Sequence, residues 1–166
     1  MKNIVFVIIM VLFSILLTSC AASTPQVDEQ DIIGYKLPVM PTDSTAVVYV
    51  IRPDQTVIGN LGAKHTDFGI SIDGFSQAIP NASVVVFILK PGEHTIVAKS
   101  ENKSETLLNA QAGRIYFYQI NTKLGWVVGR VQTESLDEVT GTYQVKQFYE
   151  EEETPVLNLQ AFSAPQ

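Results

Sequence analysis

The chain has 166 residues, of which 46% are hydrophobic, and its 17 acidic residues outnumber 11 basic ones for a formal net charge of −6. An acidic surface disfavours nucleic acids and anionic lipid headgroups as ligands. The single cysteine, Cys20, excludes an intrachain disulfide and a metal site built from clustered cysteines.

The first 19 residues have the pattern of a secretory signal. Lys2 supplies a positive charge, and residues 4–17 are apolar apart from Ser14. This run is shorter than the roughly 20 residues that a transmembrane helix needs, but it suits the core of a signal peptide. An ordinary cleaved signal with a chance cysteine, or an uncleaved anchor, are the alternatives to the lipid anchor considered next.

Leu17-Thr18-Ser19-Cys20 resembles the signal of bacterial lipoproteins. The resemblance implies that the sulfur of Cys20 takes a diacylglycerol, that residues 1–19 are removed, and that Cys20 begins the mature chain. Ala21 is not the Asp that retains many such lipoproteins in the inner membrane. We therefore expect a lipid anchor at Cys20 in the outer membrane, with the protein facing the periplasm.

Residues 20–44 are rich in Pro, Ser, Thr and Asp and show no sustained periodicity. This composition is typical of a linker between a lipid and a folded domain. The apolar residues within 32–39 leave a second interpretation open, in which this part docks on the domain as an extended arm.

From Ala46 onward the sequence predicts β-strands separated by turns. Asp73-Gly74 suits a tight hairpin, and Lys90-Pro91-Gly92-Glu93 suits a type II turn, so the middle of the chain is predicted to be an antiparallel meander. Residues 83–89 are continuously apolar, which indicates a central strand buried on both faces. The predicted strands cover residues 46–51, 68–72, 75–79, 83–89, 94–101, 106–112, 114–122 and 126–131.

These strands predict an all-β fold: a single antiparallel β-sandwich of seven or eight short strands over residues 45–148. The part after residue 131 is ambiguous. Leu136, Val139 and Tyr143 have helical spacing and Ser135 with Glu138 resembles a capping box, which favours a short helix near 136–140 followed by a strand. Gly141 and the surrounding threonines favour extended chain instead. Residues 149–166 contain four consecutive glutamates, at 150–153, and are predicted to form an acidic, flexible tail, although its apolar residues could bind a partner.

Several motifs together resemble the bacterial family DUF2846 over residues 45–148. They are Ala46-Val-Val-Tyr-Val-Ile-Arg-Pro, Ile72-Asp-Gly, Leu89-Lys-Pro-Gly-Glu-His-Thr and Gln111-Ala-Gly-Arg-Ile-Tyr-Phe. Residues 70–98 are also similar to PEGA domains, which have the same order of turns. Both resemblances imply a small β-sandwich of immunoglobulin or prealbumin-like type, and neither implies a catalytic residue or a cofactor.

Aromatic residues are the best lead to a binding surface. Tyr116-Phe117-Tyr118 must place side chains on both faces of its strand. If one face were exposed, Tyr116, Tyr118 and the lone Trp126 would form a platform for sugar rings or for a partner strand, whereas packing in the core is the alternative.

The sequence gives little support for catalysis or metal binding. A metal site would need a third soft ligand beside His65 and His94, and the sequence offers none. His94 lies at the exit of a turn, where we expect it to form a hydrogen bond with a backbone carbonyl. No phosphate loop, His-Glu-x-x-His or Gly-x-Ser-x-Gly motif is present. We interpret the three arginines Arg52, Arg114 and Arg130 as solvent-exposed residues at strand ends. In the alternative interpretation they meet at one edge of a sheet and bind a carboxylate or a phosphate. An enzyme would require His94, Asp67 and an arginine to meet.

We therefore expect a non-enzymatic lipoprotein without metal or cofactor, whose sandwich is a structural or protein-interaction module in the cell envelope. Its partners would be the membrane, through Cys20, and an envelope protein or peptidoglycan. A glycan or small-ligand binding module that uses the aromatic strand is the alternative function.

Overall fold

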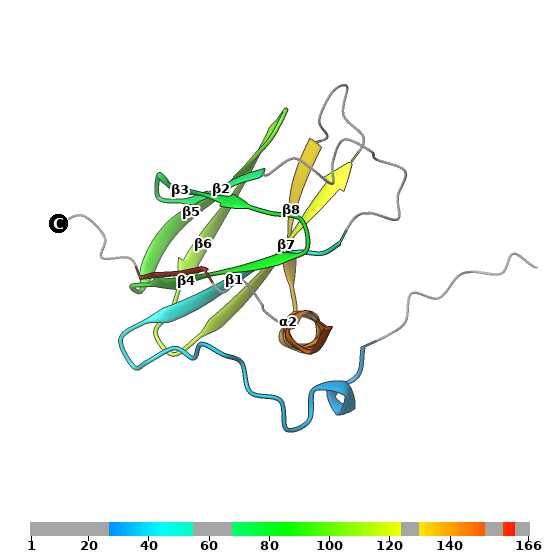
Figure 1. Ribbon diagram of the computed structural model, residues 1–166. Helices are drawn as coiled ribbons and strands as arrows, with labels where there is room; N and C mark the ends of the chain where they lie inside the picture. Colours follow the sequence, from blue (N-terminus) through cyan, green and yellow to red (C-terminus); the bar gives the residue numbers. More distant parts are fainter. Residues whose placement is uncertain (1–26, 55–67, 124–129, 152–157, 162–166) are drawn as a thin grey trace, which may run out of the picture.

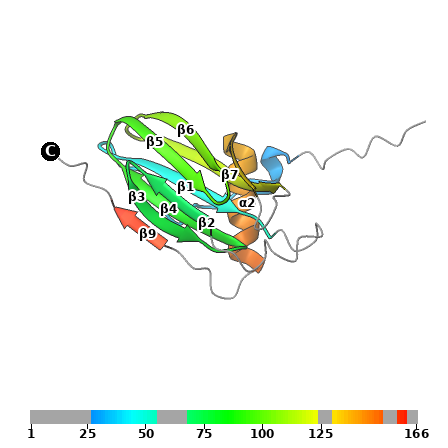
Figure 2. The same cartoon turned by 90° about the horizontal axis from the view of Figure 1, so that it is seen from above.

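The computed structural model describes residues 27–54, 68–123, 130–151 and 158–161. Its strands form two layered sheets, which confirms the predicted β-sandwich (Figures 1 and 2). A five-stranded sheet has the order β8-β7-β1-β4-β9, and a four-stranded sheet has the order β3-β2-β5-β6. The strands are β1 (Ala46–Arg52), β2 (Phe68–Ile72), β3 (Phe75–Ile79), β4 (Ser83–Leu89), β5 (Gly92–Lys99), β6 (Lys103–Ala110), β7 (Ile115–Lys123), β8 (Arg130–Leu136) and β9 (Asn158–Ala161).

The predicted hairpin at Asp73-Gly74 is confirmed. These two residues have φ angles of 52° and 85°, and they join β2 to β3 in antiparallel register. Both central positions of a tight hairpin turn need positive φ, which Gly adopts freely and Asp tolerates.

The predicted meander beyond β3 is wrong. β4 lies in the five-stranded sheet, where it pairs with β1 and β9, while β5 pairs with β2 and β6 in the other sheet. The Lys90-Pro91-Gly92 segment is therefore a corner between the sheets and not a hairpin, with Gly92 at a φ of 142°. Two pairs, β1 with β7 and β4 with β9, are parallel, so the five-stranded sheet is mixed.

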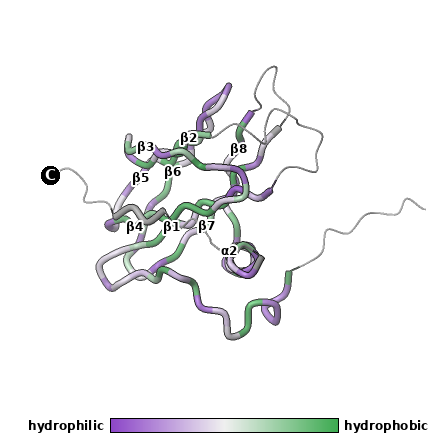
Figure 3. Tube along the Cα trace, in the orientation of Figure 1, coloured by the Kyte–Doolittle hydropathy of each residue, from purple (hydrophilic) through white to green (hydrophobic). Residues whose placement is uncertain are grey.

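The five-stranded sheet is buried on both faces. Val48, Val85 and Phe87 belong to the core between the two sheets, whereas Val47, Tyr49 and Val86 belong to a second cluster on the opposite face. Every residue of β1 is buried. In Figure 3, β1 and β4 are coloured mainly as hydrophobic, which is the composition expected of strands covered on both faces. The prediction that residues 83–89 form a central strand is thus confirmed.

The second face is covered by a helix, α2 (Glu138–Glu151), that lies on the opposite side of the five-stranded sheet from β2, β3 and β5 (Figure 1). The predicted helix was too short, and the strand expected after it is wrong, because residues 143–145 are helical. Asp137 precedes the helix and caps it: its carboxylate accepts hydrogen bonds from the backbone N–H and the hydroxyl of Thr140 at 2.9 and 2.7 Å. These bonds lower the pKa of Asp137.

Gly141 permits the close approach of α2 to the sheet. A Cβ atom at this position would lie 2.2 Å from Cγ of Phe117. The glycine that favoured extended chain in the sequence is therefore a packing requirement of the helix.

The segment before β1 docks on the domain, so its interpretation as a plain linker is wrong for residues 29–39. A 3-10 helix, η1 (Glu29–Ile32), is followed by Tyr35, Leu37 and Val39, which pack against the second cluster. The buried Tyr49 hydroxyl accepts the Val39 N–H at 2.8 Å and donates to the Val39 carbonyl at 2.7 Å. Lys146 of α2 donates to the Asp31 carbonyl at 2.8 Å. We call residues 29–39 the docked arm.

The expected tail also differs from its prediction where it is described. The helix continues through residue 151, and β9 pairs with β4. The domain is therefore not confined to residues 45–148.

Candidate binding groove

A groove of about 390 Å³ lies between α2 and the end of the five-stranded sheet at which β1 ends and β4 begins. It is lined by Ile51, Pro53, Asp54, Ala82, Tyr143, Gln144, Gln147 and Phe148. Its volume is within the range of small-molecule sites.

Two elements of local structure create this groove. On the helix, residues 143, 144, 147 and 148 are spaced so that they share one face. Opposite them, Pro53 follows the end of β1, and the connection from β3 to β4 turns at Ala82, which has a φ of 49°. Asn81 donates to the Asp54 carboxylate at 2.7 Å and so joins these two connections. The Gln144 amide donates to Gln119 of β7 at 2.6 Å, which fixes the helix against the sheet.

The lining indicates which ligand chemistry fits. Tyr143 and Phe148 offer aromatic surface, and Gln144 and Gln147 offer amide groups that both donate and accept. Neither Lys nor Arg is among the described lining residues, and Asp54 is the acidic one. This combination suits an uncharged, hydroxyl-rich ring better than a phosphate or a carboxylate.

The predicted aromatic platform is not an exposed surface where the structure describes it. Tyr118 is only 5% exposed and lies in the core between the sheets, where burial raises the pKa of its phenol. Tyr116 is half-buried; its hydroxyl accepts the Gln111 N–H at 3.0 Å and donates to the Asn109 carbonyl at 3.3 Å. A small depression of about 190 Å³ lies beside these two tyrosines at the start of β7. Trp126 lies outside the described residues.

The arginines do not converge. Arg52 is fully buried, so the prediction of a solvated strand end is wrong for it: its guanidinium lies 4.0 Å from the centroid of the Phe68 ring and donates to the Ile79 carbonyl at 2.6 Å. Arg114 immediately precedes β7 and is exposed. Arg130 pairs with Lys123 at the other end of β7 and is also exposed. Arg52 therefore holds β1 against β2 and β3.

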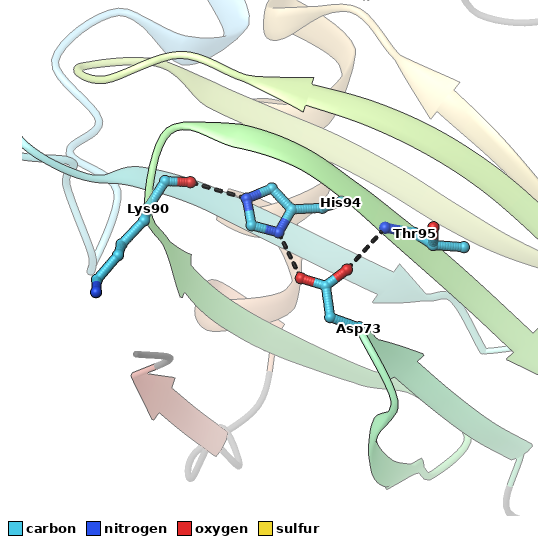
Figure 4. Close-up of polar contacts among 4 residues, drawn as sticks. All are labelled: Asp73, Lys90, His94 and Thr95. Atoms are coloured by element: carbon cyan, nitrogen blue, oxygen red, sulfur yellow. Dashed lines mark hydrogen bonds and ion pairs between the residues drawn. The ribbon is translucent and has the colours of Figure 1, made fainter. Parts of the chain in front are cut away.

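His94 and Asp73 connect the two turns singled out in the sequence (Figure 4). His94 is 7% exposed; its Nε2 lies 2.8 Å from the Lys90 carbonyl, as expected, and its Nδ1 lies 2.6 Å from the Asp73 carboxylate. The Lys90 carbonyl and the Asp73 carboxylate are both hydrogen-bond acceptors. Asp73 also accepts the Thr95 N–H at 2.9 Å. This group fastens the hairpin to the corner and is a structural cluster.

The remaining predicted site residues cannot be placed. Cys20, His65 and Asp67 lie outside the described residues. Within the described ranges no group of three or more His, Cys, Asp or Glu side chains is arranged to hold a metal ion. In the same part of the chain, no helix is long and apolar enough to cross a membrane.

The groove was missed from the sequence because half of its lining comes from α2. A strand after the short helix near 136–140 would have placed Tyr143 and Gln144 on opposite faces. The two aromatic–amide pairs, Tyr143-Gln144 and Gln147-Phe148, were the available signal because they lie four residues apart, which is a helical spacing.

The fold and the groove define a helix-covered, two-sheet β-sandwich with a potential small-ligand site. No family model matches the sequence, and no curated protein is significantly similar to it. The resemblance to DUF2846 therefore stays a prediction that depends on the motifs quoted above.

Proposed function

We propose that this protein is a lipid-anchored, non-catalytic interaction module of the bacterial cell envelope, held in the outer membrane through Cys20 and facing the periplasm. The observation that carries the proposal is Leu17-Thr18-Ser19-Cys20 directly after an apolar run of signal-peptide length. Membership in DUF2846 is part of the same proposal.

The distribution of covered and uncovered surface supports an interaction role. The five-stranded sheet is covered on its outer face by α2 and the docked arm. No described element covers the outer face of the four-stranded sheet, where Leu107 of β6 is 82% exposed, next to Thr95 of β5 in the ladder. An uncovered sheet face that carries an exposed leucine suits contact with another protein.

Mass spectrometry of the protein from its native membrane tests the anchor. We expect a mature terminus at Cys20 that carries a diacylglycerol and an amide-linked acyl chain, and a Cys20→Ser variant that keeps its signal and loses the lipid. A free thiol on Cys20 would contradict the proposal.

Crosslinking in intact cells tests the interaction role. We expect wild-type protein to be recovered with an envelope protein or with peptidoglycan, and a Leu107→Glu variant to recover less of it. As the control, Gln132→Glu places the same charge on an exposed position of β8. Recovery of neither type of partner would argue against the interaction role.

The groove favours a second candidate function, the binding of a neutral sugar. Its two aromatic rings and two amides are the observation behind this candidate. A titration with a neutral N-acetylglucosamine tetramer, followed by NMR, should shift resonances of Tyr143 and Phe148. Gln147→Ala should weaken the binding, whereas Gln132→Ala, an exposed glutamine outside the groove, should leave it unchanged. Shifts spread evenly over the surface would reject the candidate.

A further inference from the structure

The outer edge of β4 has the features of a strand-accepting edge. β4 pairs with β1 along all seven of its residues on one side, whereas on the other side only the four residues of β9 pair with it. Its sequence, Ser-Val-Val-Val-Phe-Ile-Leu, contains no charge and no proline. An apolar edge without these features readily pairs with any available strand.

The opposite side of the sandwich is closed in a different way. There, the side-chain amide of Asn102 accepts the Val131 N–H at 2.7 Å and donates to the Val131 carbonyl at 2.8 Å. The Ser104 hydroxyl accepts the Thr133 N–H at 3.1 Å. These bonds join the edges of β6 and β8, whereas the edge of β4 is covered by a separate strand, β9.

The strand that covers this edge contacts the rest of the described domain mainly through β4. Among the described elements, β4 is the one with which β9 has substantial contact. β9 pairs in parallel register, from Val85 with Asn158 to Ile88 with Ala161. It follows α2 along the chain.

We propose that the edge of β4 is a self-assembly site, which receives residues 158–161 from a second copy of this chain. The exchanged strand makes the same backbone ladder in both arrangements, so exchange retains every β4–β9 contact. The copy is favoured over an unrelated peptide because this segment already matches the edge in register. Anchoring of both copies to one membrane face would raise their effective concentration. The inference deepens the proposed interaction role by naming the partner.

Cysteine pairs across the ladder test the exchange. Ile88 and Ala161 are partners in the register of β4 and β9, so cysteines at these positions would lie within reach of a disulfide. The experiment uses the mature chain with Cys20→Ser, in which Ile88→Cys and Ala161→Cys are carried by separate chains that are refolded together. We expect mild oxidation to give a covalent heterodimer whose linked peptides contain residues 88 and 161.

Two controls make the result decisive. A mixture of the Ala161→Cys chain with a Glu134→Cys chain, whose cysteine lies on exposed β8, should give at least tenfold less heterodimer. Light scattering should show that the Cys20→Ser chain forms dimers with rising concentration, and that a chain ending at residue 153 does not.

A chain that carries both Ile88→Cys and Ala161→Cys reports on pairing within one molecule. An intramolecular disulfide in that chain, with no heterodimer in the mixture and a monomer at every concentration, would overturn the exchange. Absence of both disulfides would overturn it as well, because β9 would then not pair with β4. Neither result bears on lipidation of Cys20, because the lipid is absent from the chain used.

Discussion

Gly141→Ala should destabilise the domain, although in most helices the same change is stabilising. Alanine is favoured over glycine within a helix by about 1 kcal/mol. Here the added Cβ would lie 2.2 Å from Cγ of Phe117 and 2.6 Å from both its Cβ and Cδ1. Separations below 3 Å cannot be accommodated without moving the helix or the ring.

The ring of Phe117 has little freedom to move. Phe117 is 2% exposed and stacks on Tyr49, with ring centroids 5.4 Å apart and an interplanar angle of 20°. Overpacking a core costs about 1–3 kcal/mol, which exceeds the gain in helix propensity at the upper end of the range. We expect a net loss of up to about 2 kcal/mol in the free energy of unfolding and a fall in Tm of up to about 8 °C.

Urea unfolding of the chain from residue 21 onward, followed by circular dichroism, measures this change. A double-mutant cycle with Phe117→Ala isolates the contact, because removing the ring takes away two of the three close atoms. In the Phe117→Ala background, Gly141→Ala should cost less or become stabilising. If Gly141→Ala raises the stability of the otherwise wild-type chain, the close approach of helix and sheet is refuted.

Three further changes test the polar contacts. Tyr149→Phe should reduce the alkaline loss of stability, because burial, with the nearby Tyr35 phenol, raises the pKa of Tyr149 from 10.0 to about 12. The unfolded phenol then ionises first, so stability present below pH 10 is lost as the pH rises toward 12; urea unfolding from pH 8 to 12 measures this. Asn102→Ala should cost about 2 kcal/mol, since it removes two hydrogen bonds to Val131, and thermal unfolding measures the loss. Asp73→Asn should keep the turn but cost about 1–2 kcal/mol by weakening the contact with His94.

Each of these changes has an outcome that would contradict it. A Tyr149→Phe chain with the same alkaline decline as wild type would mean that this phenol does not couple to folding. Asn102→Asp keeps the acceptor and loses the donor, so it should fall between Asn102 and Asn102→Ala in stability; equal stability of all three would reject the closure of β6 onto β8. For Asp73→Asn, an unchanged Tm would show that the contact with His94 adds nothing.

Local chemistry accounts for what could be predicted from the sequence. The hairpin at Asp73-Gly74 follows from the two residues that tolerate positive φ. The alternating or continuously apolar runs gave most strand positions within a few residues, because burial of one or both faces sets their pattern. The buried pattern of residues 83–89 also placed this strand in the sheet interior.

Contacts between distant parts of the chain account for the errors. Pro91-Gly92 is compatible with a hairpin and with a corner, and only the pairing of β4 with β1 decides between them. The helix was underestimated because Thr140, Gly141 and Thr142 have low helix propensity, which packing against Phe117 overrides. The groove could not be predicted without the helix, because its aromatic and amide side chains share a face only in helical geometry.

If Cys20 carries the proposed lipid, the docked arm shortens the part of the chain between that lipid and the folded body. At full extension, the eight residues from 21 to 28 would span about 28 Å, whereas the 25 residues from 21 to 45 would span about 85 Å. The hydrogen bonds between Val39 and Tyr49 hold the arm on the domain and so keep this connection short. In the proposed lipid-anchored protein, a partner would therefore have to come to the membrane surface to meet this domain, because the domain could not travel far from Cys20.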